Sequence, residues 1–343
     1  MKTIKTIKTM KTMKTMKTIN LFIATFVLLL SVSCSNDEPS QETKDVYVAG
    51  VELNTSTKRG MATLWKNGVA TNLTNGTNAA GAQSVYVYGK DVYVAGQEYN
   101  GKYYKGMLWK NGVATDITDG SRDAFLYSVF VSGNDVYLAG QEGGQAKIWK
   151  NGVATQLSSI YSSSYTKAYS VTVSGNDVFV AGVEGGFAKL WKNGDSVGLF
   201  SASIKAGAAK SVFATGTSVY VAGNLSNLMT TAILWREDGV GTDLSDGNAH
   251  EYANSVFVQG KDVYVAGYKY DDEKGKDVLK LWKNGIASEI ATDARPQSLF
   301  VSDSDVYIAG NDSDGGKLWI NGVHTKFGNN YTELNSVFVS TSK

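Results

Sequence analysis

Two short motifs recur along the chain at a nearly constant spacing, and this repeat limits the possible folds more than any other feature. The first motif has the form DVYVAG and begins, at spacings of 41 to 46 residues, at Asp45, Asp91, Asp135, Asp177, Ser218, Asp262 and Asp305. The second motif, LWKNG in its commonest form, follows each time and contains all seven tryptophans, at Trp65, Trp109, Trp149, Trp191, Trp235, Trp282 and Trp319. A period of this length is typical of architectures in which one supersecondary unit packs on the next.

Each repeat predicts four antiparallel strands. A third motif, serine followed by alternating hydrophobic residues, precedes DVYVAG across a short glycine turn such as SGN. The Asn-Gly pair of LWKNG marks a second tight hairpin. We name the four strands A (SVFV), B (DVYVAG), C (LW) and D (ATxL). The abundance of glycine (37) and tyrosine (19), with only two prolines, suits many short strands joined by turns.

The two ends of the repeat region complement each other. The first unit enters at strand B with Asp45, whereas residues 336–340 form a strand A with no strand B after them. We expect the two to pair and close a ring, which removes the open sheet edges. An open solenoid of seven units is the alternative, but it would need polar caps that the chain does not show.

Residues 45–343 therefore resemble the seven-bladed β-propellers, and the resemblance implies an all-β ring of four-stranded antiparallel blades. The Gly-His and Trp-Asp pairs of WD repeats are missing, and the double glycines of kelch repeats occur only sporadically, as at Gly143-Gly144. The resemblance thus implies a fold and no named functional family.

The first forty residues resemble a bacterial lipoprotein signal. Residues 1–17 carry six lysines and no acidic residue, an apolar run follows over residues 21–30, and small residues precede Cys34. We predict a signal peptide over residues 1–33 and a lipid on Cys34. Ser31 stands where this motif usually has leucine, so cleavage without a lipid is the alternative. The start codon is open among Met1, Met10, Met13 and Met16.

Residues 34–44 form a predicted flexible tether that begins Ser35-Asn36-Asp37-Glu38 after the cysteine. This acidic stretch resembles the surface-export signal of some Gram-negative lipoproteins. We therefore expect a lipid-anchored protein on the outer membrane, exposed at the cell surface. A solvated linker facing the periplasm is the alternative.

Charge and cysteine content narrow the possible partners. Residues 34–343 contain 27 basic and 32 acidic groups, a net charge of −5, which argues against nucleic acid as a partner. Cys34 is the only cysteine, so the predicted propeller has no disulfide, thiolate metal site or cysteine nucleophile. We expect a monomer without cofactor or metal that touches the membrane only through its lipid.

We expect one face of the ring to carry the function. The A–B and C–D turns lie on one face and are short and uniform, whereas the B–C and D–A loops lie on the other and vary. This second face, the loop face, is rich in aromatic residues: Tyr99, Tyr103, Tyr104, Phe125, Tyr127, Tyr161, Tyr165, Tyr169, Tyr252, Tyr268, Tyr270 and Tyr331. Aromatic rings beside polar groups suit sugars, although any one of them could simply pack a loop against a blade.

One position of strand A varies while its neighbours repeat. Immediately before the repeated serine stands a hydrogen-bonding residue in every unit: Gln83, Tyr127, Tyr169, Lys210, Asn254, Gln297 and Asn335. We call these seven the mouth residues, because strand A should be innermost and they should then surround the mouth of the central channel. Beneath them we expect Ser84, Ser128, Ser170, Ser211, Ser255, Ser298 and Ser336. The mouth residues predict a pocket for a small polar ligand, with a water-filled channel entrance as the alternative.

Other polar groups give weaker signals. The carboxylates that follow strand B should be too widely spaced to act together and are predicted to form a solvated rim: Glu52, Glu98, Glu142, Glu184 and Asp312. The acidic residues 271–273 lack the pattern of a calcium loop. His250 is predicted to be an exposed loop histidine, with the base of a lyase or hydrolase as the alternative.

These observations predict a non-enzymatic recognition module that binds a carbohydrate or another surface ligand on its loop face. A protein-interaction scaffold in an envelope complex is the first alternative. A glycan-active lyase or hydrolase is the less favoured one, because no carboxylate pair or histidine constellation is visible. The candidate binding residues are the mouth residues, and no catalytic residue or metal ligand is predicted.

Overall fold

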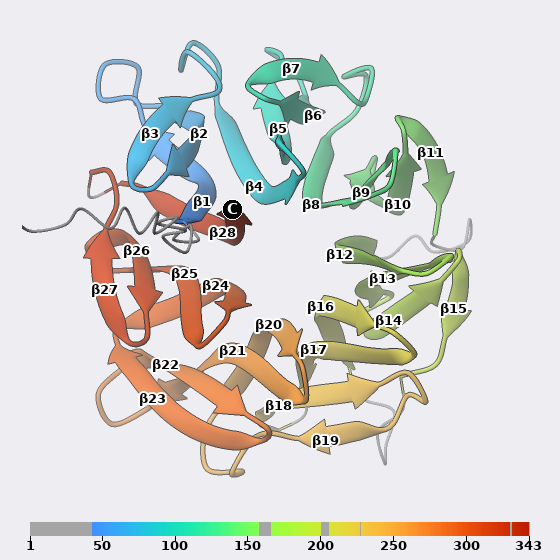
Figure 1. The fold of residues 1–343 in the computed structure, drawn as a ribbon, viewed down its shortest axis with the longest axis vertical. Helices are drawn as coiled ribbons and strands as arrows, with labels where there is room; N and C mark the ends of the chain where they lie inside the picture. Colours follow the sequence, from blue (N-terminus) through green and yellow to red (C-terminus); the bar gives the residue numbers. More distant parts are fainter. Residues whose placement is uncertain (1–42, 158–165, 200–205, 227, 330, 343) are drawn as a thin grey trace, which may run out of the picture. The chain divides into compact units, whose positions relative to one another are not determined.

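The computed structural model describes residues 43–157, 166–199, 206–226, 228–329 and 331–342, and it confirms the seven-bladed propeller (Figure 1). The described residues form seven four-stranded antiparallel sheets, the blades, each with strand A nearest the centre of the ring. The predicted signal, Cys34, Tyr161 and Tyr165 lie outside these residues. Within them, no helix is long and apolar enough to cross a membrane.

Each blade runs from strand A at the centre of the ring to strand D at its edge. Blade 1 consists of β28 (Glu333–Ser342), β1 (Thr43–Leu53), β2 (Gly60–Lys66) and β3 (Val69–Asn72). Blade 2 consists of β4 (Ala80–Tyr88), β5 (Asp91–Tyr99), β6 (Tyr104–Lys110) and β7 (Val113–Asp116). Blade 3 consists of β8 (Ala124–Ser132), β9 (Asp135–Glu142), β10 (Gln145–Lys150) and β11 (Val153–Gln156). Blade 4 consists of β12 (Thr166–Ser174), β13 (Asp177–Glu184), β14 (Phe187–Lys192) and β15 (Asp195–Val197).

The other three blades follow the same plan. Blade 5 consists of β16 (Ala206–Thr215), β17 (Ser218–Ser226), β18 (Thr230–Arg236) and β19 (Gly241–Asp243). Blade 6 consists of β20 (Glu251–Gln259), β21 (Asp262–Asp271), β22 (Lys276–Lys283) and β23 (Ile286–Thr292). Blade 7 consists of β24 (Ala294–Ser302), β25 (Asp305–Asp312), β26 (Gly315–Ile320) and β27 (Val323–Lys326).

The two ends of the repeat region pair and close the ring, as the sequence predicts. β28 lies antiparallel to β1, with Tyr47 opposite Phe338. Pairing extends to Thr43, which lies opposite Ser342, so β1 begins two residues before the predicted start of the propeller. The innermost strands then contact one another in sequence around the ring, and β28 contacts both β24 and β4. Blade 1 is therefore built from both ends of the propeller.

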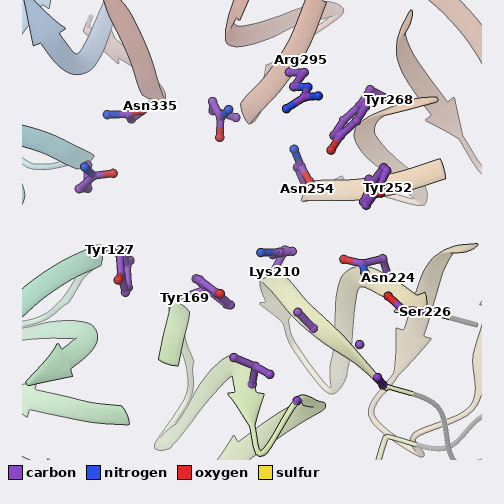
Figure 2. Close-up of a pocket in the computed structure, with 17 residues that line it drawn as sticks. Tyr127, Tyr169, Lys210, Asn224, Ser226, Tyr252, Asn254, Tyr268, Arg295 and Asn335 are labelled. Carbon is purple, nitrogen blue, oxygen red and sulfur yellow. The ribbon is translucent and has the colours of Figure 1, made fainter. Parts of the chain in front are cut away.

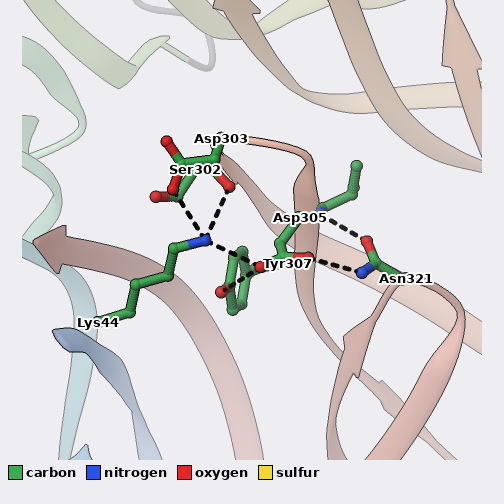
Figure 3. A network of polar contacts seen from close by, with 7 residues as sticks. Lys44, Ser302, Asp303, Asp305, Tyr307 and Asn321 are labelled. Carbon is green, nitrogen blue, oxygen red and sulfur yellow. Dashed lines mark hydrogen bonds and ion pairs between the residues drawn. The ribbon is translucent and has the colours of Figure 1, made fainter. Parts of the chain in front are cut away.

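A polar network adds a second connection between blade 1 and blade 7 (Figure 3). The Nζ of Lys44 on β1 donates to Asp305 Oδ2 at 2.9 Å and to the backbone carbonyl of Ser302 at 3.3 Å. It also lies 3.0 Å from Asp303 Oδ2. Hydrogen bonds to the two carboxylates, Asp305 first, raise the pKa of Lys44 well above its ordinary value. Side chains as well as backbone thus tie the first strand to the last blade.

The hydrophobic core is divided into clusters that lie between neighbouring blades, seven in the described residues. Trp149 of blade 3, for example, packs with Leu126 and Val129 of its own blade and with Tyr93 and Ala95 of blade 2. All seven repeated tryptophans are at most 2% exposed. The repeat therefore places its tryptophans in the core between blades.

The recurring polar residues of the repeat are also structural. In blade 2, Asn111 Nδ2 donates to Asp91 Oδ1 at 2.8 Å, and the backbone N–H of Val92 donates to Asn111 Oδ1. Lys110 Nζ lies 2.7 Å from the other oxygen of Asp91. Asn111 and Gly112 have φ angles of 50° and 80°, which a two-residue hairpin turn of this type requires. The Asp and Asn-Gly of the two motifs thus fasten the C–D turn to strand B.

Candidate functional site

The seven mouth residues share one backbone feature: each is the extra residue of a β-bulge between strands A and B. In blade 3, Leu126 lies opposite Gly140 and Ser128 lies opposite Ala139, so Tyr127 is the additional residue of β8. The register shifts at the same place in every other blade, at Gln83, Tyr169, Lys210, Asn254, Gln297 and Asn335. A bulge bends its strand and redirects the side chain of the extra residue.

The glycine that ends each DVYVAG motif makes this bulge possible. At Gly140 a Cβ atom would overlap the backbone carbonyl oxygen of Phe125. In the other six blades, a Cβ atom would overlap the equivalent carbonyl group if it were added to the glycine at this position: Gly50, Gly96, Gly182, Gly223, Gly267 and Gly310. Because glycine alone lacks a Cβ, it permits this close approach of two backbones. The glycine of the repeated motif and the bulge that carries the mouth residue therefore depend on each other in every blade.

The structure places all seven mouth residues around one cavity of about 640 Å³ (Figure 2). Their role in binding a ligand stays a prediction. In the view of Figure 2, Tyr127, Tyr169 and Lys210 lie below the opening, and Asn335 and Asn254 lie above it. Side chains from all seven blades thus border a single concave site.

The serines beside the mouth residues are engaged in the framework. The Oγ of Ser84 accepts a hydrogen bond from the backbone N–H of Val129 in the next blade at 3.2 Å. Ser336 accepts one from Val85 at 3.2 Å, which continues the series across the ring closure. The same bond forms at the five other blade interfaces, at Ser128, Ser170, Ser211, Ser255 and Ser298. These serines join the innermost strands, which leaves the mouth residues as the candidates for ligand contact.

An aromatic layer lines the channel at the position two residues after each of these serines on strand A. Six blades place a tyrosine or phenylalanine there, and successive rings contact each other with centroids 4.6 to 4.9 Å apart: Phe130, Tyr86, Phe338, Phe300, Phe257 and Phe213. Thr172 takes this position in blade 4. The polar mouth therefore lies above an apolar layer of the channel.

Two asparagines of the mouth are held in place by hydrogen bonds to the neighbouring blade. Asn254 Nδ2 donates to the backbone carbonyl of Pro296 at 2.7 Å, and Asn335 Nδ2 donates to that of Ala82 at 2.9 Å. These bonds use the amide nitrogens and leave the carboxamide oxygens able to accept hydrogen bonds from a ligand.

An aromatic arc leads from the mouth towards the outer part of blades 2 and 3. The Nζ of Lys210 lies 4.2 Å from the ring centroid of Tyr169, and Tyr169 contacts Tyr127 with centroids 5.6 Å apart. Tyr127 is nearly parallel to Phe125, which in turn contacts Tyr104 at 5.2 Å. The arc supplies stacking surfaces beside the hydrogen-bonding groups of the mouth.

The opposite part of the mouth contains side chains that the sequence pattern did not assign to the site. Tyr252 and Tyr268 stack with centroids 4.6 Å apart, and the guanidinium group of Arg295 lies 5.0 Å from the centroid of Tyr268. Arg295 Nε is bound to Asp277 Oδ2 at 2.5 Å, which raises the pKa of Arg295. Burial raises the pKa of Tyr268 to about 12, so its hydroxyl group stays protonated at neutral pH.

The sequence carried a signal for part of this group. Tyr252 and Arg295 stand two residues before the mouth residues Asn254 and Gln297, and side chains two apart on a strand point to the same side. Asn224 and Tyr268, which also line the cavity, follow the glycine of strand B in their blades. These positions alone do not define the group, because the equivalent residues Phe125 and Gln97 of other blades do not line the cavity.

A smaller cavity of about 210 Å³ adjoins the mouth and contains His250. It shares Tyr252, Tyr268 and Arg295 with the larger cavity, and Asp277 and Tyr270 complete its lining. The Nδ1 of His250 accepts a hydrogen bond from the backbone N–H of Thr230 at 3.0 Å. His250 is thus half-buried beside the candidate site, rather than an exposed loop histidine.

The interpretation of the strand-B carboxylates as a solvated rim was wrong for three of them. Glu142 Oε2 lies 2.5 Å from Lys147 Nζ, Glu184 Oε2 lies 3.4 Å from Lys189 Nζ, and the carboxylate of Asp312 is paired with Lys317. The three carboxylate side chains are only 12 to 17% exposed. In each case the lysine comes from strand C of the same blade, so the B–C hairpin shields the pair from water.

No metal site is evident in the described part of the chain. Asp271, the last residue of β21, is paired with Lys274 at 2.7 Å. Among the described residues, no group of three or more His, Cys, Asp or Glu side chains is placed to hold a metal ion. The mouth is accordingly defined by amide, phenol and cationic groups.

Comparison with known proteins identifies the fold alone. No protein-family model matches the chain, and no curated protein matches its sequence. The chain is similar to uncomplexed acylaminoacyl peptidase from Pyrococcus horikoshii, with 14% identity, a TM-score of 0.52 and coverage of 82% of this chain. The likeness covers 50% of the peptidase, so the chain spans about half its length. The chain is also similar to periplasmic gluconolactonase from Pseudomonas aeruginosa, with 12% identity, a TM-score of 0.50 and coverage of 87% of this chain and 99% of that one.

These comparisons correct the prediction that the chain is not an enzyme. The prediction relied on the lack of a recognisable catalytic constellation in the sequence. The similar propellers are nevertheless named as enzymes, and the gluconolactonase matches over nearly its whole length. A propeller of this size is thus compatible with catalysis, and the architecture gives no ground for setting the chain apart from enzymes.

Proposed function

We propose that the protein binds a carbohydrate at the mouth of the central channel on its loop face. The observation that carries this proposal is the set of seven bulge residues around one cavity, which comprise four carboxamides, two phenol rings and one ammonium group. Carboxamides can donate to and accept from sugar hydroxyls, while the apolar face of a sugar ring packs on tyrosine. The cavity volume, about 640 Å³, suits a small ligand.

The aromatic arc supports the same ligand class. Tyr169, Tyr127 and Phe125 lie side by side at the mouth, and their rings are half-buried rather than enclosed in the core. A flat surface of this kind beside fixed carboxamides is the combination that carbohydrate rings require.

The proposal includes a location at the cell envelope. It takes the lipid on Cys34, the outer membrane and display at the cell surface from the sequence of residues 1–44. The propeller would then present its loop face to glycans of the surroundings.

A glycan panel tests the proposal, with capture of envelope proteins carried out in parallel. We expect the purified protein to bind at least one glycan and Tyr127→Ala or Tyr169→Ala to abolish that binding while the melting temperature is kept. Tyr88→Ala provides a matched control, because Tyr88 lies at the end of β4 beside an A–B turn, on the other face. A stable protein partner together with no glycan binding would reject the proposal in favour of an envelope scaffold.

One observation favours a glycan-active enzyme as the second candidate function. His250 lines the smaller cavity that shares Tyr252, Tyr268 and Arg295 with the mouth, so a sugar bound there would lie beside an imidazole, a side chain that many enzymes use as a general acid or base. Incubation with oligosaccharides and mass analysis of the products tests this role. His250→Asn should abolish turnover while its carboxamide oxygen can still accept the hydrogen bond from Thr230; unchanged turnover would exclude His250 as a proton carrier.

A further inference from the structure

The charge of the cavity lining differs from that of the chain as a whole. The described residues that line the larger cavity include two cations, Lys210 and Arg295, and no carboxylate. Residues 34–343 as a whole carry a net charge of −5. A concave site that concentrates positive charge on an acidic protein favours a negatively charged ligand.

Arg295 is prepared to receive an anion. Asp277 holds its Nε at 2.5 Å, and the guanidinium plane lies against the ring of Tyr268 at 5.0 Å from the centroid. The side chain is therefore positioned before a ligand arrives, and its two terminal nitrogens form the fork that matches a carboxylate. Asp277 compensates part of the charge but does not line the larger cavity.

Lys210 supplies the second positive charge from the neighbouring sector of the ring. It is the one charged residue among the seven mouth residues, and its ammonium group is oriented by the ring of Tyr169 at 4.2 Å. Lys210 belongs to β16, Asn254 to β20 and Arg295 to β24, so the two cations come from blades 5 and 7 and flank the asparagine of blade 6. Figure 2 shows these three side chains along one part of the opening.

Building on the proposed carbohydrate function, we infer that the bound sugar is acidic, a ring that carries a carboxylate, and that Lys210 and Arg295 bind this group. The ring of Tyr169, beside Lys210, offers a stacking surface to this sugar, and the stacked pair of Tyr252 and Tyr268 in the same sector offers one to a neighbouring ring. Asn254, fixed by its bond to Pro296, offers its carboxamide oxygen to a hydroxyl group. One sector of the mouth thus combines a carboxylate site, a stacking surface and a hydrogen-bond acceptor.

The inference is tested by titration calorimetry of the purified full-length protein with trigalacturonate and with its methyl ester. The two probes have the same rings and hydroxyls and differ in charge. A parallel pair, glucuronate oligomers and their methyl esters, covers the other common ring configuration. We expect the acid of at least one pair to bind about tenfold or more tightly than its ester, as charge-assisted hydrogen bonds predict, and added salt to weaken only the acid.

Three variants assign the effect to the two cations. Lys210→Gln and Arg295→Gln should each reduce the preference for the acid over the ester about tenfold, while binding of the ester changes little. Lys261→Gln, in the A–B turn of blade 6 on the opposite face, should leave the preference unchanged. Because the preference is also measured on the unaltered protein, the test holds even if a variant does not fold.

The results separate this inference from the proposed function. Equal affinity for acid and ester would overturn the acidic ligand while leaving carbohydrate binding in place. If none of these probes and no member of the wider glycan panel binds, the carbohydrate function and the inference fall together. An acid preference that both Lys210→Gln and Arg295→Gln retain would also overturn the inference, because the carboxylate would then be bound elsewhere.

Discussion

Lys44 Nζ lies 2.9 Å from Asp305 Oδ2, so a salt bridge joins the first strand of the propeller to its last blade. It reinforces the pairing of β1 with β28, through which blade 1 is assembled from the two ends of the propeller. The pairing removes the edge that strand B of blade 1 would otherwise leave open to other chains. It also holds the innermost strands around the channel, and with them the seven mouth residues.

Removal of residues 336–343 should lower the melting temperature sharply and promote aggregation, because strand B of blade 1 becomes an open edge beside the channel. Thermal unfolding followed by circular dichroism measures the effect. Removal of residues 342–343 alone is the control and should have little effect, since most of the pairing with β1 remains. An unchanged melt after the longer deletion would contradict the closure of the ring by β28.

Gly140→Ala should destabilise the protein by about 2 kcal/mol or more, because the new Cβ overlaps the carbonyl oxygen of Phe125 and forces the bulge at Tyr127 to shift. Gly106→Ala is the matched control in a neighbouring blade. The atoms nearest to its Cβ would belong to the side chain of Leu126, at 3.0 Å or more, rather than to a backbone carbonyl group, so a smaller loss of stability is expected. Urea unfolding of both variants gives the free energies of unfolding, and equal values would show that the bulge does not depend on glycine.

Substitutions of two neighbouring residues of β8 should have opposite effects on stability and on sugar binding. Ser128→Ala removes the acceptor for the backbone N–H of Val171 and should cost about 1 to 3 kcal/mol of stability without changing sugar affinity. Tyr127→Ala should remove sugar binding with little change in stability. Paired calorimetry and unfolding experiments separate the framework from the site; loss of binding in Ser128→Ala at unchanged stability would reverse these assignments.

The melting temperature should fall as the pH drops below about 4, the ordinary pKa of aspartate. In six blades a lysine and an asparagine hold the pKa of the strand-B aspartate below its usual range: Asp45, Asp91, Asp135, Asp177, Asp262 and Asp305. A lowered folded-state pKa means that the stabilisation is present above the ordinary pKa and is lost as the pH falls through the folded value.

The opposite dependence applies to Lys44, whose pKa is raised. Its stabilising effect is present below the ordinary pKa of lysine and is lost only as the pH rises through the folded value. Melting curves recorded from acid to alkaline pH test both the loss of stability at low pH and the loss at high pH. Asp91→Asn should weaken the acid dependence and Lys44→Met the alkaline one, whereas a melting temperature that stays constant towards low pH would contradict the role of the aspartates.

Much of the architecture could be predicted from the sequence because every blade repeats the same local information. The Asn-Gly turns, the buried tryptophans and the complementary ends led directly to a closed seven-bladed ring. The position before the repeated serine likewise led to seven residues that the structure gathers around one cavity. The bulge that directs them was not predicted, although the glycine of strand B marks it in every repeat.

Features that depend on contacts between different strands could not be predicted in the same way. The pairing of Glu142 with Lys147 depends on how strand C lies beside strand B, and its burial was missed for that reason. The cluster of Arg295, Tyr268 and Asp277 brings together residues from blades 6 and 7 that no single repeat contains. The prediction that the chain is not an enzyme relied on the lack of a recognisable catalytic constellation in the sequence, and it is contradicted by similar structures that are named as enzymes.

The most direct test of carbohydrate binding at the mouth is a crystal structure of the protein with the tightest-binding glycan of the panel. We expect a sugar ring in the cavity on the loop face, within hydrogen-bonding distance of mouth residues and stacked on at least one of Tyr127 and Tyr169. A glycan bound with full occupancy elsewhere, with this cavity occupied only by solvent, would contradict binding at the mouth.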